Sequence, residues 1–400
     1  MRTIDKRALL GVLLLVCFYK AQASDADTVK PWSIEGSFFY GKIFKHDAYV
    51  KSTLKNGPTR IYDLRLGYAD RFSEEAEGYA YPTYGVGFSV VDFGDVTLYH
   101  ASDLGNLYVL YLFWNQHLLD FGRFRWTCQG DIGPVYNTDT FDPIANQGKD
   151  FSSSALMMYI GLTTGLKYRL SDRWEIGTNV NIRHYSNGRL GVINKGFNIV
   201  GGTLTLAYHL SSEKYAPEKK PTLPVHKGLY YHISAGGGVQ TYIEDWLLYI
   251  QSDDAYQQPY IEKYHPKYFI STDAMYRFSR QYGGGLGVDL FYTPSLNSLQ
   301  EWDLHRSDYA GNPTPEYRFW SVGIAWNQEI YYKNLALTTS LGYYLYRKMG
   351  WREKTESPVY ERFGLRYYFP QWSNVFGSCS VKAHKFHLAE YFELSVGKKF

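Results

Sequence analysis

The pattern of residues 174–210, WEIGTNVNIRHYSNGRLGVINKGFNIVGGTLTLAYHL, decides the fold class. Apolar side chains alternate with polar or small ones up to position 183, and the same alternation returns from position 200. This two-residue period is typical of β-strands that lie between apolar and polar surroundings. The apolar faces are Trp174, Ile176, Thr178, Val180 and Ile182 on the first segment, and Val200, Leu204, Leu206, Tyr208 and Leu210 on the second. The sequence therefore predicts two strands joined by a connection rich in Gly and Asn.

Three polar residues interrupt the apolar faces. By parity, His184 and Ser186 continue the apolar face of the first strand, and Asn198 begins that of the second. If the strands form a hairpin folded about Gly191, positions 184 and 198 lie opposite each other, and paired side chains on one face are about 5 Å apart. A serine, a histidine and an orienting amide form a hydrolytic triad. We therefore predict Ser186 as nucleophile, His184 as base and Asn198 as the group that orients the base.

The connection after Ser186 offers donors for an oxyanion. We expect the backbone N–H groups near Asn187 and Gly188, or the amides of Asn187 and Asn194, to stabilise a tetrahedral intermediate. Arg189 is a candidate for binding an anionic phosphate or headgroup by bidentate hydrogen bonds. A plain surface arginine is the alternative for that position.

The same alternation continues through most of the chain and predicts sixteen strands. Those of the first half are 32–45, 58–70, 82–92, 104–118, 120–136, 154–170, 172–186 and 197–210. Those of the second half are 228–242, 267–279, 283–294, 316–331, 333–347, 358–370, 374–386 and 389–400. Between the halves, residues 211–226 carry charges and three prolines and read as a linker. An apolar exterior with a charged interior predicts an all-β transmembrane barrel protein.

Two topologies fit this count: two tandem eight-stranded barrels, or one sixteen-stranded barrel. Side chains can fill the interior of eight strands, whereas sixteen leave a channel. Large residues predicted to face inward favour the two barrels, which would span residues 24–210 and 227–400. These residues are Tyr159, Lys167, Arg169, Arg123 and Arg125.

Composition and the chain ends indicate the compartment. Residues 1–23 combine basic residues, a short apolar run and Ala21-Gln22-Ala23, as in a secretory signal peptide. The 39 Tyr, 37 Gly and 23 Phe are typical of a barrel with aromatic girdles. A terminal aromatic, Phe400, on an amphipathic last strand predicts delivery by the outer-membrane assembly machinery of a Gram-negative bacterium. The net charge of +3, with both signs interspersed, gives no indication of a nucleic-acid partner, and we expect none.

The motif resembles two families of outer-membrane lipid hydrolases that share His-x-Ser-Asn-Gly and an orienting residue fourteen positions after the His, here His184 to Asn198. The longer resemblance, over roughly residues 80 to 210, is to the lipid A 3-O-deacylase (PagL-like, acyloxyacyl hydrolase) family of eight-stranded barrels. It includes Asn194-Lys195-Gly196 and implies an esterase that removes the 3-O acyl chain of lipid A in lipopolysaccharide without cofactor or metal. The well-known deacylases carry a glutamate where this chain has Asn198.

Two other functions stay open. Ser186-Asn187-Gly188-Arg189 is also similar to outer-membrane phospholipase A, which implies a His-Ser-Asn triad and a need for calcium, with Arg189 helping to form the calcium site. A structural or pore-forming barrel without activity is the second. The second half has Phe386 where a nucleophile would follow His384, so we predict a non-catalytic barrel with Lys382, His384 and Glu390 facing its lumen.

Overall fold

The computed structural model describes most of the chain beyond the predicted signal peptide. The residues described are 31–45, 48–55, 57–71, 73–94, 96–98, 104–142, 149, 151–211, 227–252, 257–258, 260–305, 316–350, 353, 357–386 and 388–400. The predicted signal peptide and all but the first residue of the predicted linker lie outside these ranges.

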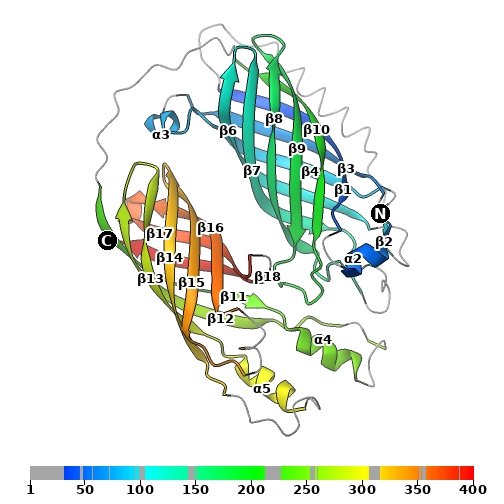
Figure 1. Ribbon diagram of the computed structural model, residues 1–400, viewed down its shortest axis with the longest axis vertical. Helices are drawn as coiled ribbons and strands as arrows, with labels where there is room; N and C mark the ends of the chain where they lie inside the picture. The colour runs from blue at the N-terminus through cyan, green and yellow to red at the C-terminus, as the bar shows by residue number, and fades with distance from the viewer. Residues whose placement is uncertain are drawn as a thin grey trace.

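Residues 32–209 form a closed antiparallel barrel of eight strands (Figure 1). The first strand pairs with the last, Ser33 lying opposite His209, which leaves no open edge. The strands are β1 Trp32–Ile43, β3 Thr59–Ala69, β4 Thr83–Asp92, β6 Asn106–Phe121, β7 Phe124–Asn137, β8 Leu156–Arg169, β9 Trp174–Ser186 and β10 Phe197–His209.

Residues 228–399 form a second closed barrel, in which β11 pairs with β18 (Figure 1). Its strands are β11 Gly228–Gln240, β12 His265–Arg277, β13 Tyr282–Tyr292, β14 Trp320–Tyr332, β15 Leu335–Tyr346, β16 Val359–Phe369, β17 Val375–His384 and β18 Leu388–Lys399. The prediction of two eight-stranded barrels is confirmed, and the alternative of one sixteen-stranded barrel is wrong. The predicted strand bounds differ from those observed by at most four residues, as at the start of β7.

The predicted faces are confirmed along β9 and β10. Val180 is 60% exposed and Leu204 62%, whereas Asn181 is fully buried in the lumen. The prediction that Arg123 faces the lumen is wrong, because residues 122–123 form the hairpin turn between β6 and β7 and this arginine is exposed. Lys167 and Tyr159 do point inward, where each has a carboxylate partner.

Long connections gather at one end of each barrel, here called the loop end. It carries helices α2 Ala48–Thr53, α4 Ile243–Ile250 and α5 Leu296–His305, and the short pair β2 Leu54–Lys55 and β5 Thr97–Leu98 (Figure 1). The opposite, turn end carries helix α3 Glu74–Glu77 and the 3-10 turn η2 Pro370–Trp372. Of the helices described, none is long and apolar enough to cross a membrane.

Charged pairs fill both lumens. In the first barrel Arg183, 1% exposed, forms a bidentate pair with Asp63, at 2.9 Å and 3.2 Å. In the second, the buried Glu390 pairs with Lys382 and with His384, the latter at 3.0 Å. The prediction that these residues face the second lumen is therefore confirmed. A buried charge needs such partners, because leaving it unpaired in a low-dielectric interior is costly.

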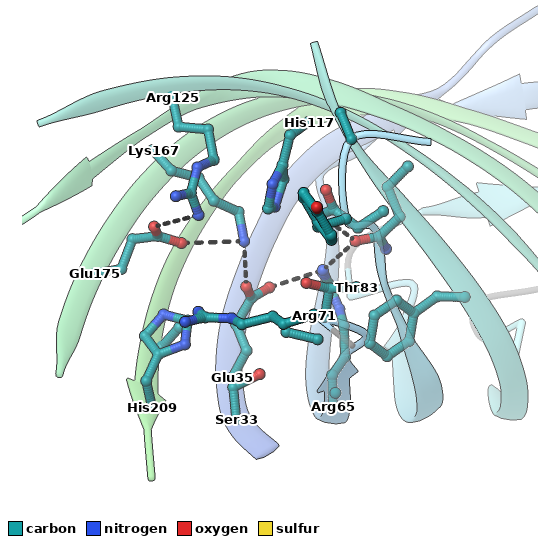
Figure 2. A pocket seen from close by; sticks show the side chains of 18 of the residues that line it. Ser33, Glu35, Arg65, Arg71, Thr83, His117, Arg125, Lys167, Glu175 and His209 are labelled. Atoms are coloured by element: carbon teal, nitrogen blue, oxygen red, sulfur yellow. Dashed lines mark hydrogen bonds and ion pairs between the residues drawn. The ribbon is translucent and has the colours of Figure 1, made fainter. Parts of the chain in front are cut away.

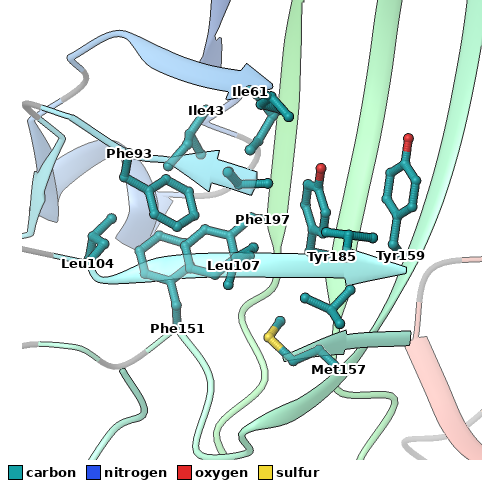
Figure 3. Packing of buried hydrophobic residues seen from close by; sticks show 14 of the residues in the cluster. Ile43, Ile61, Phe93, Leu104, Leu107, Phe151, Met157, Tyr159, Tyr185 and Phe197 are labelled. Carbon is teal, nitrogen blue, oxygen red and sulfur yellow. The ribbon is translucent and has the colours of Figure 1, made fainter. Parts of the chain in front are cut away.

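An apolar cluster closes the lumen of the first barrel at the loop end (Figure 3). Phe197 stacks on Phe151 with ring centroids 4.5 Å apart and packs against Phe93 at 4.8 Å. Tyr185 stacks on Tyr159 at 5.0 Å. Because Tyr185 and Phe197 are the inward neighbours of the predicted triad residues, this cluster anchors the strand ends that carry the triad.

The two barrels lie side by side and touch at both ends (Figure 1). At the turn end, Asp70 of the first barrel accepts hydrogen bonds from Tyr332 at 2.6 Å and Lys333 at 2.5 Å of the second. The ring of Tyr332 packs edge-on against Trp114 at 4.5 Å. At the loop end, Phe141 packs against Trp246 of α4 at 5.5 Å.

Candidate functional site

The predicted triad lies at the loop end of the first barrel, on its outer face. In the register of β9 and β10, His184 faces Asn198 directly. Ser186 ends β9 on the same outward face. All three side chains are half-buried. Their chain neighbours Tyr185 and Phe197 are buried in the lumen cluster. Strand parity therefore puts the three polar groups on the bilayer side and their anchors on the other.

His184 and Asn198 are joined by a hydrogen bond. The distance from His184 Nδ1 to Asn198 Oδ1 is 2.7 Å. An amide oxygen can only accept, so Nδ1 is the donor in this bond, and in the neutral ring Nε2 is then the nitrogen without a proton. This is the tautomer that proton abstraction from a serine hydroxyl requires.

Gly196 holds the serine and the histidine in one small space. A Cβ placed on Gly196 would lie 3.5 Å from Ser186 Cβ and 3.5 Å from His184 Cε1. The φ of Gly196 is +66°, a conformation that favours glycine. The glycine thus lets the chain turn into β10 while leaving room for the two side chains.

The connection 187–196 is held by Asn187, which is fully buried. Its side-chain amide donates to Ser152 Oγ at 3.1 Å and to the carbonyl of Ile193 at 2.9 Å, and its Oδ1 accepts from the N–H of Arg189 at 3.0 Å. The backbone N–H of Asn187 donates to Asn194 Oδ1 at 3.0 Å. Asn187 therefore shapes the loop, and both its donors are already engaged there.

The remaining predicted site residues take different positions. Gly188 and Arg189 have φ of +56° and +68°, two successive left-handed residues that stand two and three positions after Ser186. The carbonyl of Arg189 accepts from Thr241 of the second barrel. Asn194 is half-buried, and its oxygen is the acceptor for the loop. The N–H of Gly188 and the amide nitrogen of Asn194 are thus the candidate oxyanion donors.

A cavity of about 330 Å³ lies elsewhere, in the lumen at the turn end of the first barrel (Figure 2). Its charges are paired: Glu35 bonds Arg65 at 2.7 Å and Lys167 at 2.8 Å, and Glu175 lies 3.4 Å from Lys167. The lumen wall separates this cavity from the outer face, and the apolar cluster closes the lumen beyond it. We interpret it as the polar filling of a narrow barrel and place the site at the triad.

Metal ligands are not grouped anywhere in the part of the chain that the structure describes. No three His, Cys, Asp or Glu side chains come together there as a metal site would require.

The sequence did not indicate which residues of the second barrel reach the site. Thr241, Glu262 and Phe392 all contact the connection 187–196. Glu262 lies in an irregular segment after α4, and Thr241 directly follows the end of β11. No periodicity marks either position, and contacts between two barrels leave no signal in the pattern of one strand.

Comparisons with known families match both barrels. The family of lipid A 3-O-deacylases (PagL) matches residues 62–207, and the C-terminal domain of acyloxyacyl hydrolase matches residues 229–400. The first match falls in the barrel with the triad, and the second covers the other barrel. The resemblance to outer-membrane phospholipase A stays a prediction. No curated protein matches the chain.

Several solved structures are similar to parts of the chain or to most of it. Neisserial surface protein A shares 12% identity over 45% of this chain and 97% of its own, with a TM-score of 0.27. The N-terminal barrel of Pseudomonas aeruginosa OprF is 16% identical in sequence over 44% of this chain and 97% of its own, with a TM-score of 0.24. An outer-membrane channel from Pseudomonas putida F1 is 9% identical in sequence over 95% of this chain and 100% of its own, with a TM-score of 0.21.

Proposed function

The chain belongs to the PagL-like family of outer-membrane lipid A 3-O-deacylases, and from that premise we propose that it cleaves the ester with Ser186 as nucleophile. Its activity class is carboxylic ester hydrolysis and its substrate is lipid A. His184 is the general base in this proposal, and Asn198 orients it. In this proposal the second barrel contributes no group to the reaction itself.

One observation carries the proposal: the 2.7 Å hydrogen bond between His184 and Asn198 on the outer face, beside Ser186. A polar pair that faces a bilayer is energetically costly, so its presence there indicates a functional role. Here the pair stands next to Ser186, and both Ser186 and His184 lie within 3.5 Å of where a Cβ on Gly196 would be. An interfacial histidine without a catalytic role would not need a bound orienting amide.

The proposed reaction has two steps. Ser186 Oγ attacks the ester carbonyl carbon while its proton passes to Nε2 of His184. The N–H of Gly188 and the Asn194 amide stabilise the oxyanion. The sugar oxygen leaves with the proton from His184, and the acyl chain stays on the serine. Water then gives a proton to Nε2 of His184 and attacks the acyl carbonyl carbon; the bond to Ser186 Oγ breaks, His184 returns the proton to that oxygen, and the fatty acid is released.

The surroundings of the triad suit an acyl chain that lies in the bilayer. Ile182 on β9 and Val200 on β10 are the next residues on the same outer face, exposed by 54% and 39%, and Ile160 on β8, exposed by 38%, lies opposite His184. They form an apolar surface below and beside the triad. An acyl chain can lie against this surface while the sugar stays near the loops.

The proposal is tested with purified protein in detergent micelles and lipid A, by weighing the products by mass spectrometry. We expect wild type to release one hydroxyacyl chain, with or without chelator, and Ser186→Ala to give no detectable product. The matched control is Thr178→Ala, which changes an exposed residue on the same strand and face and should keep wild-type activity. Equal product from wild type and Ser186→Ala would refute the serine mechanism. Lysophospholipid that forms from diacyl phospholipid and vanishes with chelator would instead support the phospholipase reading.

A further inference from the structure

The second barrel contacts the first at the loop that follows the nucleophile. Three of its residues converge there: Thr241 after the end of β11, Glu262 after α4, and Phe392 on the outer face of β18. Three separate segments thus contact one connection of ten residues, 187–196. The two barrels therefore share an extended interface at this connection and not an isolated contact.

Glu262 is the strongest of the three contacts. Its Oε1 accepts from the backbone N–H of Val192 at 3.0 Å and from Ser153 Oγ at 2.5 Å, both in the first barrel. Its Oε2 is buried with no hydrogen-bond partner among the described residues. Burial raises the pKa of this carboxyl, although the bonds from Ser153 and Val192 oppose that shift. The half-buried carboxylate of Glu262 thus accepts one backbone N–H and one hydroxyl of the first barrel. These bonds fix the connection 187–196 at Val192.

Thr241 holds the near side. It is 1% exposed and binds the carbonyl of Arg189 twice, from its backbone N–H at 3.0 Å and from Oγ1 at 3.1 Å. The φ of Arg189 is +68°, a left-handed conformation that is strained for a residue with a Cβ. The N–H of Arg189 is held by Asn187 in its own loop, and its carbonyl is held by the other barrel. Both sides of this strained residue are therefore restrained.

Phe392 packs against Gly188, the residue directly before Arg189. A Cβ on Gly188 would lie 2.2 Å from Phe392 Cε2, so the ring is in close contact with this glycine. The φ of Gly188 is +56°, and its N–H is a candidate oxyanion donor. The aromatic ring limits how far this peptide can move.

We propose that the second barrel completes the active site of the first, with Thr241, Glu262 and Phe392 as positioning residues that hold the oxyanion-binding loop in its catalytic conformation. The inference rests on the proposed function. None of the three contacts the triad or the ester in this proposal. They act through the backbone of residues 188–192, whose placement decides whether donors meet the oxyanion.

The test compares two variants of Glu262 with a control variant at the next position, all in the full chain. Glu262→Met keeps the volume but cannot accept a hydrogen bond, whereas Glu262→Gln keeps an acceptor oxygen. Lys263→Gln is the matched control, since its side chain is 66% exposed on the same segment. Initial rates of hydroxyacyl release from lipid A micelles give kcat and KM, and folding is checked by the gel mobility of unheated samples. Thr241→Val, which loses only the hydroxyl bond, replaces Glu262→Met if that variant does not fold.

We expect Glu262→Met to lower kcat about tenfold to a hundredfold and to keep KM within about threefold of wild type. The reason is that a shift of the oxyanion donors by about 1 Å can lower the rate by a factor of that size. Thr241→Val should lower kcat in the same way by a smaller factor, and Glu262→Gln and Lys263→Gln should stay near wild type. A folded Glu262→Met enzyme with wild-type kcat, a change confined to KM, or a Glu262→Gln variant as impaired as Glu262→Met would overturn the inference. Ser186→Ala in the same assay separates the two proposals: if it equals wild type, the serine mechanism has failed and not the positioning role.

Discussion

The hydrogen bond from His184 to Asn198 permits a quantitative prediction. We consider Asn198→Leu, which keeps a similar volume and removes the acceptor. In the ground state the 2.7 Å bond joins two neutral groups, and such a bond contributes about 0.5–1.5 kcal/mol. In the transition state the imidazole gains a proton, and a hydrogen bond from a charged group contributes about 1.5–3 kcal/mol. Asn198→Leu loses the bond in both states, so kcat falls by the difference between the two contributions, about 1–1.5 kcal/mol, which is about fivefold to twelvefold.

The opposite change tests the same reasoning with the other sign. Asn198→Asp keeps the geometry and places a carboxylate on the imidazolium, and bonds between ionised groups are roughly twice as strong as neutral ones. We expect kcat to increase, by up to about tenfold. The assay is hydroxyacyl release from lipid A, with Thr178→Ala as control. If Asn198→Leu matched wild type while Ser186→Ala was inactive, the amide would not orient the base and this account of the triad would be wrong.

Two further predictions concern the supports of the site. Phe197→Ala removes the ring that stacks on Phe151 at 4.5 Å, and deleting a buried phenylalanine ring costs about 3–5 kcal/mol, which urea unfolding in micelles should show together with lower kcat. At the turn end, burial opposes ionisation of Asp70, but hydrogen bonds from Lys333, Tyr332 and Ser73 outweigh it and hold its pKa well below the ordinary value. A lowered folded pKa gives stability that is present above the unfolded pKa and lost only as pH falls through the folded one. We therefore expect protease resistance of the barrel contact to persist into acid in wild type, and to be weaker at neutral pH in Asp70→Asn. Equal resistance of the two proteins would contradict this.

The strand pattern predicted the barrels and the outward positions of His184, Ser186 and Asn198, because both depend on local parity. Val180 and Leu204 alternate with Asn181 and Thr203 since each faces either lipid or lumen, and that contrast is visible in the sequence. The opposition of residues 184 and 198 followed from one hairpin register. Parity cannot describe turns, which explains why Arg123 was assigned to the lumen although it lies in a two-residue hairpin turn.

The loop chemistry was less accessible to prediction. Asn187 stands next to Ser186, the proposed nucleophile, and its side-chain amide has two donors. The sequence therefore predicted that this amide would bind the oxyanion. In the structure those donors bind Ser152 and Ile193, which come together only once the connections before β8 and β10 have folded onto each other. Likewise the role of Glu262 depends on the packing of two barrels, a feature that no single strand encodes.

A triad on the outside of a barrel meets a physical problem that a buried site does not have. The lumen can fix β9 and β10 from behind, through Tyr185 and Phe197, but the loop above the strands extends past the apolar cluster. Lipid on the outer face offers no hydrogen bonds to hold a backbone that includes two left-handed residues. A neighbouring protein surface can supply them, and Thr241 and Glu262 do so at 3.0 Å each. If Ser186 is the nucleophile, as we propose, the second barrel contributes to catalysis by supplying the backbone restraints that the first barrel cannot build from its own lumen.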